Sequence, residues 1–228
     1  MNDANPGLSK LILTCTALGA GLNLASSFRT RGVHRSVFFF ALGTGLPAVG
    51  ELLATGPLKL LRHRLRYRMV GVPLAILLGW YAVIHGSFVV AGGVSERLHL
   101  GEGARRRTLP ALAALAGIGL DLILDPAGLD AGLWEWNADG AYAAEIEGTN
   151  GRGGVPLVNY LGWAALVGGA TYIYGLAYQD EEEELLPALL LLPYYLAAVG
   201  WALRRRRFGY LLYSAPFPIV LYAALEKK

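Results

Sequence analysis

The sequence predicts an all-α fold, a polytopic integral membrane helix bundle with about seven transmembrane helices. Hydrophobic residues make up 54% of the 228 residues, and charged residues make up only 16%, compared with roughly 25% in an ordinary soluble domain. The mean hydropathy is +0.42. The charges gather in clusters that separate apolar stretches, as loops between membrane spans do. Together these observations exclude a disordered chain, a coiled coil and a water-soluble enzyme of the usual kind.

Seven apolar stretches follow one another along the chain, and most have at least 17 residues, enough to cross a hydrocarbon core about 30 Å thick. Backbone in lipid must satisfy its own hydrogen bonds, and the alternation typical of a barrel is absent, so each stretch is predicted to be helical. The fourth is short, and Pro187 and Pro193 are expected to kink the sixth, so six or eight spans are the alternatives. The stretches are Leu8–Phe28, Val33–Thr55, Met69–Val94, Leu109–Asp125, Gly154–Tyr178, Leu185–Leu203 and Phe208–Leu225.

The first stretch is predicted to remain as a spanning helix and not to be a signal peptide. Lys10 is the only basic residue before its apolar part, and no clear small-residue cleavage site follows it. Residues 1–228 are therefore expected to form a single transmembrane domain. The long Gly-rich segment 126–153 is expected to be a functional loop that dips back toward the core.

The basic clusters indicate membrane lipids as partners and no nucleic acid. The net charge is +3, and anionic headgroups explain arginines beside apolar helices without a second partner. The basic residues divide almost evenly between the two sides of the predicted bundle, which leaves its orientation open. A single cysteine, Cys15, excludes a disulfide scaffold and a Cys-based zinc site. With only four histidines, a His-rich metal cluster is not expected.

Few ionisable side chains interrupt the apolar stretches, where each costs about 2.5–3.5 kcal/mol on insertion scales. They are Glu51, His85, Asp121 and, at a predicted helix end, Asp125. Two neutral polar residues, Asn23 and Asn159, join them as candidates. Since buried polar groups in membrane helices often serve function, these positions are the first candidates for a site.

Asp121 and Asp125 are four residues apart, a spacing that places both carboxyl groups on one face of a helix. Two carboxylates this close in a medium of low dielectric constant cannot both ionise easily, so one is expected to hold a proton and act as a proton donor. The structural alternative is that Asp125 ends the helix, with Pro126 stopping it, and that Asp121 pairs with an arginine.

The other candidates also have two interpretations. Glu51 is either an interfacial residue that reaches water or an interior acid or base. His85 is more often a buried hydrogen-bonding group than a catalyst. Asn159 shares a helical face with Trp163 and is suited to hold a water molecule or to cap a carboxylate. Trp134, Trp136 and Trp163 offer π faces to a cation, with an interfacial aromatic belt as the alternative.

Three stretches resemble a known family of integral membrane proteins of carotenoid biosynthesis, which includes the bisanhydrobacterioruberin hydratases and the carotenoid 1′,2′-hydratases. The first stretch is Asp121-Leu-Ile-Leu-Asp125-Pro126, continuing to Gly132-Leu-Trp134-Glu-Trp136, and the second is Gly154-Val-Pro-Leu-Val-Asn159-Tyr160-Leu-Gly-Trp163. The third is weaker: Glu51, Thr55-Gly-Pro57, Gly71-Val-Pro-Leu74 and Trp80. The chain departs from the family pattern at 58–64 and at 141–153, which bears on the substrate more than on the chemistry.

This resemblance implies hydration of a terminal isopropylidene double bond of a lipophilic carotenoid or isoprenoid, with water as co-substrate. Such a hydro-lyase type reaction needs a positioned acid, a dry pocket, aromatic faces and one held water, and no redox cofactor or metal. The expected catalytic residues are Asp121 or Asp125 as the acid, Asn159 to place the water and Glu51 to take the released proton. The residues expected to line the substrate and its cation are Trp134, Trp136, Trp163, Tyr160, Trp80, His85 and Asn23.

Two other functions remain open at this point. A membrane terpene or isoprenoid cyclase begins with the same protonation, but an internal double bond captures the cation in place of water. A lipid or proton-coupled carrier would use the acidic residues as a proton path. Carriers often contain paired broken helices in repeats, and the sequence shows no repeat at a fixed period.

Overall fold

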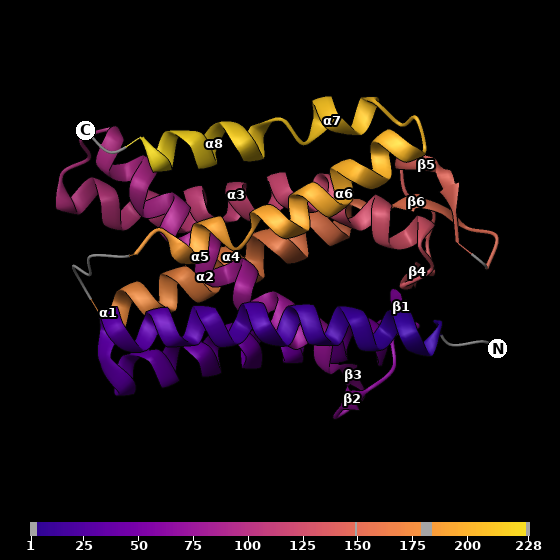
Figure 1. The fold of residues 1–228 in the computed structure, drawn as a ribbon, viewed down its shortest axis with the longest axis horizontal. Helices are drawn as coiled ribbons and strands as arrows, with labels where there is room; N and C mark the ends of the chain where they lie inside the picture. Colours follow the sequence, from indigo (N-terminus) through magenta and orange to yellow (C-terminus); the bar gives the residue numbers. More distant parts are fainter. Residues whose placement is uncertain (1–3, 149, 179–183, 227–228) are drawn as a thin grey trace.

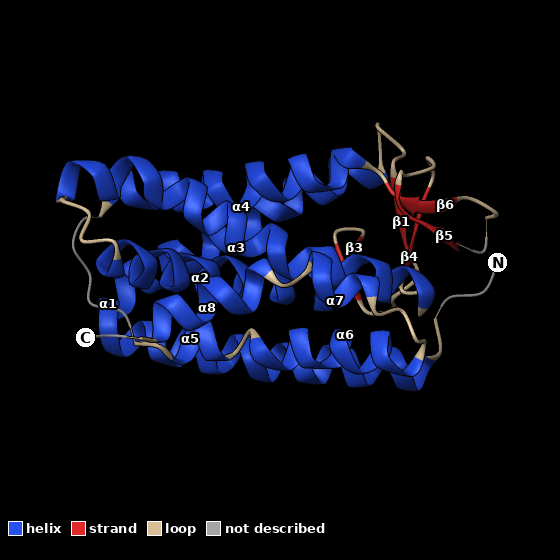
Figure 2. Ribbon diagram, turned by 90° about the horizontal axis from the view of Figure 1, so that it is seen from above, coloured by secondary structure: helices blue, strands red, loops and turns tan. Residues whose placement is uncertain are grey.

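The computed structural model describes residues 4–148, 150–178 and 184–226. It is a bundle of helices with short two-stranded sheets at one end, the end that also holds the N-terminus (Figures 1 and 2). The C-terminus lies at the opposite end of the bundle (Figure 1). The prediction of an all-α helical bundle is therefore confirmed.

The first helix, α1 (Pro6–Thr55), is a hairpin of two helical arms that together contain the first two predicted stretches. The chain reverses at Gly32, whose φ of 72° and ψ of 172° are not helical. Ser27 Oγ lies 2.9 Å from Ser36 Oγ, although nine residues of a straight helix would separate them by about 13.5 Å. Figure 1 shows the two indigo arms side by side.

Helices α2 (Leu74–Arg97) and α3 (Glu102–Asp130) correspond to the third and fourth predicted stretches with different ends. Before α2, the strands β2 (Arg68–Met69) and β3 (Val72–Pro73) form a hairpin, so this helix begins five residues later than we expected. The expectation that Pro126 stops α3 is wrong, because the helix continues to Asp130.

The physical reason for this continuation is a substituted hydrogen bond. Pro126 has no N–H to donate to the carbonyl of Leu122. The hydroxyl of Tyr142 donates to that carbonyl at 2.5 Å instead. The helix therefore tolerates the proline without a buried unsatisfied oxygen.

The remaining predicted stretches also fall on helices. The fifth becomes α4 (Leu157–Ala177). The sixth is divided into α5 (Leu186–Leu189) and α6 (Leu192–Arg204), with Pro187 and Pro193 in their first turns, as the prolines predicted. The seventh is likewise divided, into α7 (Gly209–Tyr213) and α8 (Pro216–Leu225).

Much of the predicted long loop at 126–153 has regular structure, contrary to expectation. After the last turn of α3, strand β4 (Trp134–Trp136) pairs antiparallel with β1 (Leu61–His63) from the segment that follows α1. Strand β5 (Tyr142–Glu147) pairs with β6 (Gly153–Val155). Figure 2 shows these strands together at one end of the bundle.

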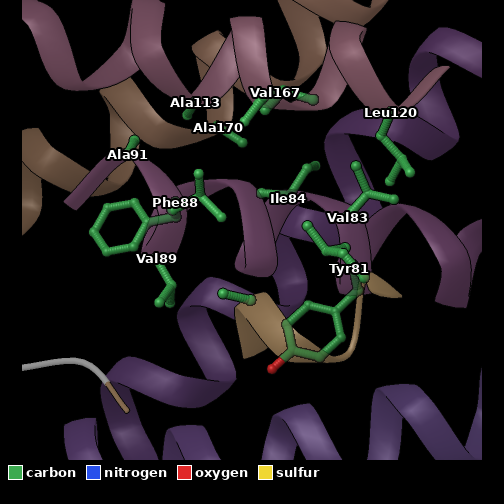
Figure 3. Close-up of a cluster of buried hydrophobic side chains, with 14 of the residues drawn as sticks. Tyr81, Val83, Ile84, Phe88, Val89, Ala91, Ala113, Leu120, Val167 and Ala170 are labelled. Carbon is green, nitrogen blue, oxygen red and sulfur yellow. The ribbon is translucent and has the colours of Figure 1, made fainter. Parts of the chain in front are cut away.

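Helix α2 forms the centre of the packed interior. In its apolar window 78% of residues are buried, against 22% in the window of α1. Figure 3 shows Tyr81, Ile84 and Phe88 of this helix in one cluster with Val167 and Ala170 of α4. The rigid α2–α3–α4 core is the frame that holds the polar residues described below.

Helix α1 is polar inside and apolar outside, the reverse of a helix on a soluble protein. Its buried residues include Asn23, Arg31 and Glu51, whereas Leu18 and Val33 on its outer side are more than 60% exposed. By length and composition, four described helical segments are suited to cross a membrane: α1, α2, α3 and Leu186–Arg204. These apolar helices indicate a membrane-associated protein.

Candidate active site

The two aspartates of α3 meet at a single amide. Asp121 and Asp125 are each 3% exposed and lie one turn apart, on the same face as the sequence predicts. The Nδ2 group of Asn159, on α4, donates to Asp121 Oδ2 at 2.6 Å and to Asp125 Oδ2 at 3.0 Å. Asn159 therefore ties the two carboxyl groups together, and its amide hydrogens are used in doing so.

Asp125 receives two further hydrogen bonds from strand β4. Trp136 Nε1 donates to Asp125 Oδ2 at 3.0 Å, and Trp134 Nε1 donates to Asp125 Oδ1. We expected these tryptophans to offer their faces to a cation, but their N–H edges bind the carboxyl group. Gly128 allows this approach, because a Cβ atom there would lie 2.0 Å from Trp134 Cζ2.

Neither aspartate pairs with a cation among the described residues. Their hydrogen bonds come from Asn159 and the two indoles, and no lysine or arginine of residues 4–148, 150–178 and 184–226 forms an ion pair with them. The alternative of an Asp121–arginine pair is therefore wrong for this part of the chain. The same residues contain no group of three or more His, Cys, Asp or Glu side chains suited to hold a metal ion.

Glu51 forms a second buried acidic centre near the first. It is 7% exposed, so the interior interpretation holds and the interfacial one does not. Trp80 Nε1 donates to Glu51 Oε1 at 2.9 Å, and His63 Nε2 lies 2.7 Å from Glu51 Oε2. Glu51 interacts electrostatically with both aspartates, which places the two centres in one acidic cluster.

His63 is the functional candidate that sequence reasoning missed. It lies between Arg62 and Arg64 in a segment that resembles a solvated basic loop. The usable signal was the alternation of Leu61, Arg62, His63 and Arg64, since alternation over a short run is typical of a half-buried strand. In the structure His63 is 4% exposed.

The β1–β4 sheet brings His63 and the tryptophans to the same place. His63 is the cross-strand partner of Trp134, and Leu61 is the partner of Trp136. Directly opposite residues of an antiparallel pair share a face, so one face of the sheet carries His63, which contacts Glu51, and the two tryptophans that donate to Asp125. On the other face, Arg64 Nη1 pairs with Glu135 Oε1 at 2.8 Å.

Aromatic side chains also belong to the surroundings of the acidic cluster. The rings of Trp80 and Trp163 lie 4.4 Å apart between α2 and α4. Tyr160, next to Asn159, interacts electrostatically with both aspartates, and its buried hydroxyl has no hydrogen-bond partner among the described residues. Of the predicted lining residues, Trp80 thus contacts the cluster through its hydrogen bond to Glu51, and Trp163 packs against Trp80.

An open cavity of about 470 Å³ is lined in part by Tyr142, Glu145, Arg207 and Tyr210. The Tyr142 ring lies 5.9 Å from that of Tyr160. At the cavity wall, hydrogen bonds from the Tyr210 hydroxyl and then the Arg207 guanidinium lower the pKa of Glu145. The cavity is thus a polar space whose wall includes a ring that packs near Tyr160.

Two predicted lining residues lie in other groups. The His85 ring is 5.1 Å from the Phe39 ring, in an aromatic cluster whose Phe39 face carries the Arg31 guanidinium at 4.2 Å. Asn23 lies fully buried in the first arm of α1, and its side-chain amide has no hydrogen-bond partner among the described residues. Neither has a hydrogen bond to the acidic cluster.

Comparison with known proteins finds a family for this chain. A family model described as carotenoid biosynthesis protein covers residues 11–212, a range that contains the whole acidic cluster and the β1–β4 sheet. No curated protein matches the chain, and no solved structure does.

Proposed function

The chain belongs to the carotenoid biosynthesis protein family, and from this premise we propose that it is an integral enzyme of a prokaryotic cell membrane that hydrates a terminal isopropylidene double bond. Family membership implies a role in carotenoid biosynthesis and a lipophilic isoprenoid substrate. The observation that carries the finer proposal is the pair of buried carboxyl groups, Asp121 and Asp125, held by one amide and paired with no cation of the part of the chain that the structure describes.

The acidic pair is suited to hold a proton out of water. Two carboxylates that share one amide donor repel each other strongly in a medium of low dielectric constant. A proton on one of them removes this repulsion. The pair then presents a carboxylic acid to a substrate that is itself a lipid, so the substrate need not leave the membrane.

The hydrogen bonds favour Asp121 as the acid. Asp125 accepts from Trp134, Trp136 and Asn159, whereas among the described residues Asp121 accepts from Asn159 alone. An ionised carboxylate only accepts hydrogen bonds, and each donor stabilises that form over the protonated one. Asp125 is therefore the carboxylate, and the proton resides on Asp121.

The proposed reaction begins when Asp121 transfers its proton to the less substituted carbon of the alkene. The π electrons form the new C–H bond, and the neighbouring carbon becomes a tertiary cation. The faces of Trp80 and Trp163 stabilise this cation. Water adds to it and loses a proton, which gives a tertiary alcohol and restores the proton balance of the enzyme.

The open cavity lined in part by Tyr142 supplies the water in this proposal. Asn159 was our candidate to place it, but both amide hydrogens of Asn159 are engaged by the aspartates. The Tyr160 hydroxyl is free of described partners and lies within electrostatic reach of both carboxyl groups. Asn159 thus positions the acid, and Tyr160 holds the water.

Co-expression in a host that makes acyclic carotenoids tests this proposal. Wild type should yield a pigment heavier by one water molecule, and Asp121→Asn should yield none, because its amide cannot deliver a proton while it can still accept from Asn159. Asp125→Asn should lose activity together with the local geometry, since an amide offers one acceptor oxygen to two indole donors. Asp139→Asn, an exposed loop variant, is the matched control and should behave as wild type.

Mass analysis of the pigments separates the alternatives. A product of unchanged mass would indicate a cyclase, because an internal double bond then captures the cation. Unchanged pigment in every strain that contains folded protein would contradict both enzymatic functions. Full hydration by Asp121→Asn would contradict the assigned acid.

A further inference from the structure

We propose that His63 is the base of this reaction: its Nδ1 atom takes the proton from the water that captures the cation, while Glu51 orients the imidazole ring. The inference rests on the proposed function and deepens it, because our sequence-based hypothesis gave the released proton to Glu51. It assigns the second proton transfer to a residue that only the folded chain brings to the site.

The contacts of Glu51 support this division of roles. Its two oxygens are engaged, Oε1 by the indole N–H of Trp80 at 2.9 Å and Oε2 by His63 Nε2 at 2.7 Å. The side chains of His63 and Glu51 are 3% and 9% exposed. A carboxylate whose two oxygens are both engaged is better suited to orient the His63 ring than to contact the substrate.

The same contact sets the tautomer of His63. A carboxylate oxygen accepts hydrogen bonds, so the ring nitrogen facing Glu51 carries the hydrogen. In a neutral imidazole the other nitrogen, Nδ1, then has a free lone pair. Glu51 also stabilises the imidazolium that forms when Nδ1 takes a proton.

The Nδ1 atom of His63 is available to accept a hydrogen bond. It is buried and has no hydrogen-bond partner among the described residues. Buried polar atoms in native proteins are almost always paired, and an unpaired one costs about 1–3 kcal/mol. The partner that fits a lone acceptor beside an acid pair is an O–H group, that of the substrate water or of the tertiary alcohol product.

The β1–β4 sheet places this acceptor opposite a residue that binds the acidic pair. His63 lies directly opposite Trp134, whose N–H binds Asp125. Opposite Cα atoms of an antiparallel pair are only about 4.5–5.5 Å apart. The proton donor and the proton acceptor therefore belong to two adjoining parts of one cluster.

The proton balance closes within the cluster. Asp121 gives one proton to the alkene and becomes a carboxylate. Water adds through an oxygen lone pair to the tertiary carbon, and the resulting oxonium gives one of its protons to His63 Nδ1. His63 then returns that proton through the next water molecule to Asp121, so each turnover consumes one alkene and one water and forms one alcohol.

The substitution His63→Gln tests this role. The glutamine amide N–H can keep the hydrogen bond to Glu51, but it offers no basic nitrogen. We expect the variant to consume the acyclic pigment, since Asp121 is intact, and to form about a hundredfold less hydrate, the scale of general base catalysis. Uncaptured cations should instead lose a proton elsewhere or cyclise, which gives isomers of unchanged mass.

The controls separate this inference from the proposed function. His99→Gln, an exposed position after α2, should leave the pigments as in wild type. Glu51→Gln should shift the product ratio as His63→Gln does, and it serves if His63→Gln does not fold. All variants are compared at equal amounts of folded, membrane-extracted protein.

Three outcomes would overturn the inference. One is a wild-type ratio of hydrate to isomers in both folded variants. Another is that pigment consumption and hydrate formation fall by the same factor in the variants, because His63 and Glu51 would then have only a structural role. If wild type itself forms no hydrate, the proposed function fails and this inference with it. If wild type hydrates, Asp121→Asn does not, and His63→Gln matches wild type, only the inference fails.

Discussion

At the scale of single residues, the site depends on an unequal division of hydrogen-bond donors between two similar carboxyl groups. Asp121 and Asp125 were recognisable from the sequence because acidic residues in an apolar helix are costly and four-residue spacing puts them on one face. Their different surroundings were not recognisable. The indoles that bind Asp125 come from a strand whose position depends on pairing with β1.

Gly128→Ala tests the importance of the indole contact. A Cβ atom at this position would lie 2.0 Å from Trp134 Cζ2, so Trp134 must leave and take its N–H away from Asp125. We expect the proton of the acidic pair to be shared more evenly between Asp121 and Asp125. The rate of hydration should then fall at least about tenfold, which corresponds to about 1.4 kcal/mol in the activation free energy. Pigment analysis and tryptophan fluorescence measure the two effects.

Gly103→Ala is the matched control on the same helix. A Cβ atom there meets no heavy atom within 4 Å, and alanine favours a helix over glycine by about 1 kcal/mol. This variant should be as active as wild type and no less stable. Wild-type activity and fluorescence in Gly128→Ala would show that the Trp134 contact is dispensable.

At the scale of elements, the helix ends differ most from sequence expectation, and each difference has a local cause. Helix α3 runs past Pro126 because a residue 20 positions away, Tyr142, satisfies the carbonyl that the proline leaves open. Helix α1 folds back at Gly32, which adopts a positive φ, so the predicted break between the first two stretches becomes a tight reversal within one helical element. Neither cause is visible in hydrophobic periodicity, because periodicity shows which face of a helix is buried and does not show where the helix ends.

Tyr142→Phe should therefore loosen the end of α3. Without the hydroxyl, the Leu122 carbonyl is left unpaired in a partly buried place, at a cost of about 1–3 kcal/mol. We expect lower unfolding stability in detergent and faster amide exchange at residues 127–131. Tyr213→Phe, at an exposed ring 5.6 Å from that of Tyr142, is the control, and equal exchange in both variants would contradict the role of Tyr142.

At the scale of the whole molecule, polar groups gather inside α1 and at the strand-capped end, while apolar side chains cover much of the outer surface. Leu11, Leu18 and Leu22, in the first arm of α1, are at least half exposed. Such a surface is stable in lipid and costly in water. It is the physical basis for proposing an integral membrane protein.

The single cysteine offers a direct test of this arrangement. Cys15 is exposed on α1 among those leucines. A spin label at Cys15 in reconstituted vesicles should collide more often with oxygen, which dissolves in lipid, than with a water-soluble nickel complex. A label at residue 141, introduced as Ala141→Cys with Cys15→Ser, should show the opposite preference, because this exposed residue lines the open cavity at the strand-capped end. Equal accessibility at both positions would contradict the membrane arrangement.

The sequence by itself determined the helical bundle, the approximate apolar stretches and the acidic pair Asp121 and Asp125, because hydrophobicity and helical spacing are local properties. Only the tertiary structure decided that His63 meets Glu51, that indole N–H groups bind Asp125 and that His85 and Asn23 lie in other groups. These contacts join positions as far apart as strands β1 and β4, and their geometry depends on strand register, in which a shift of one residue turns every side chain to the opposite face.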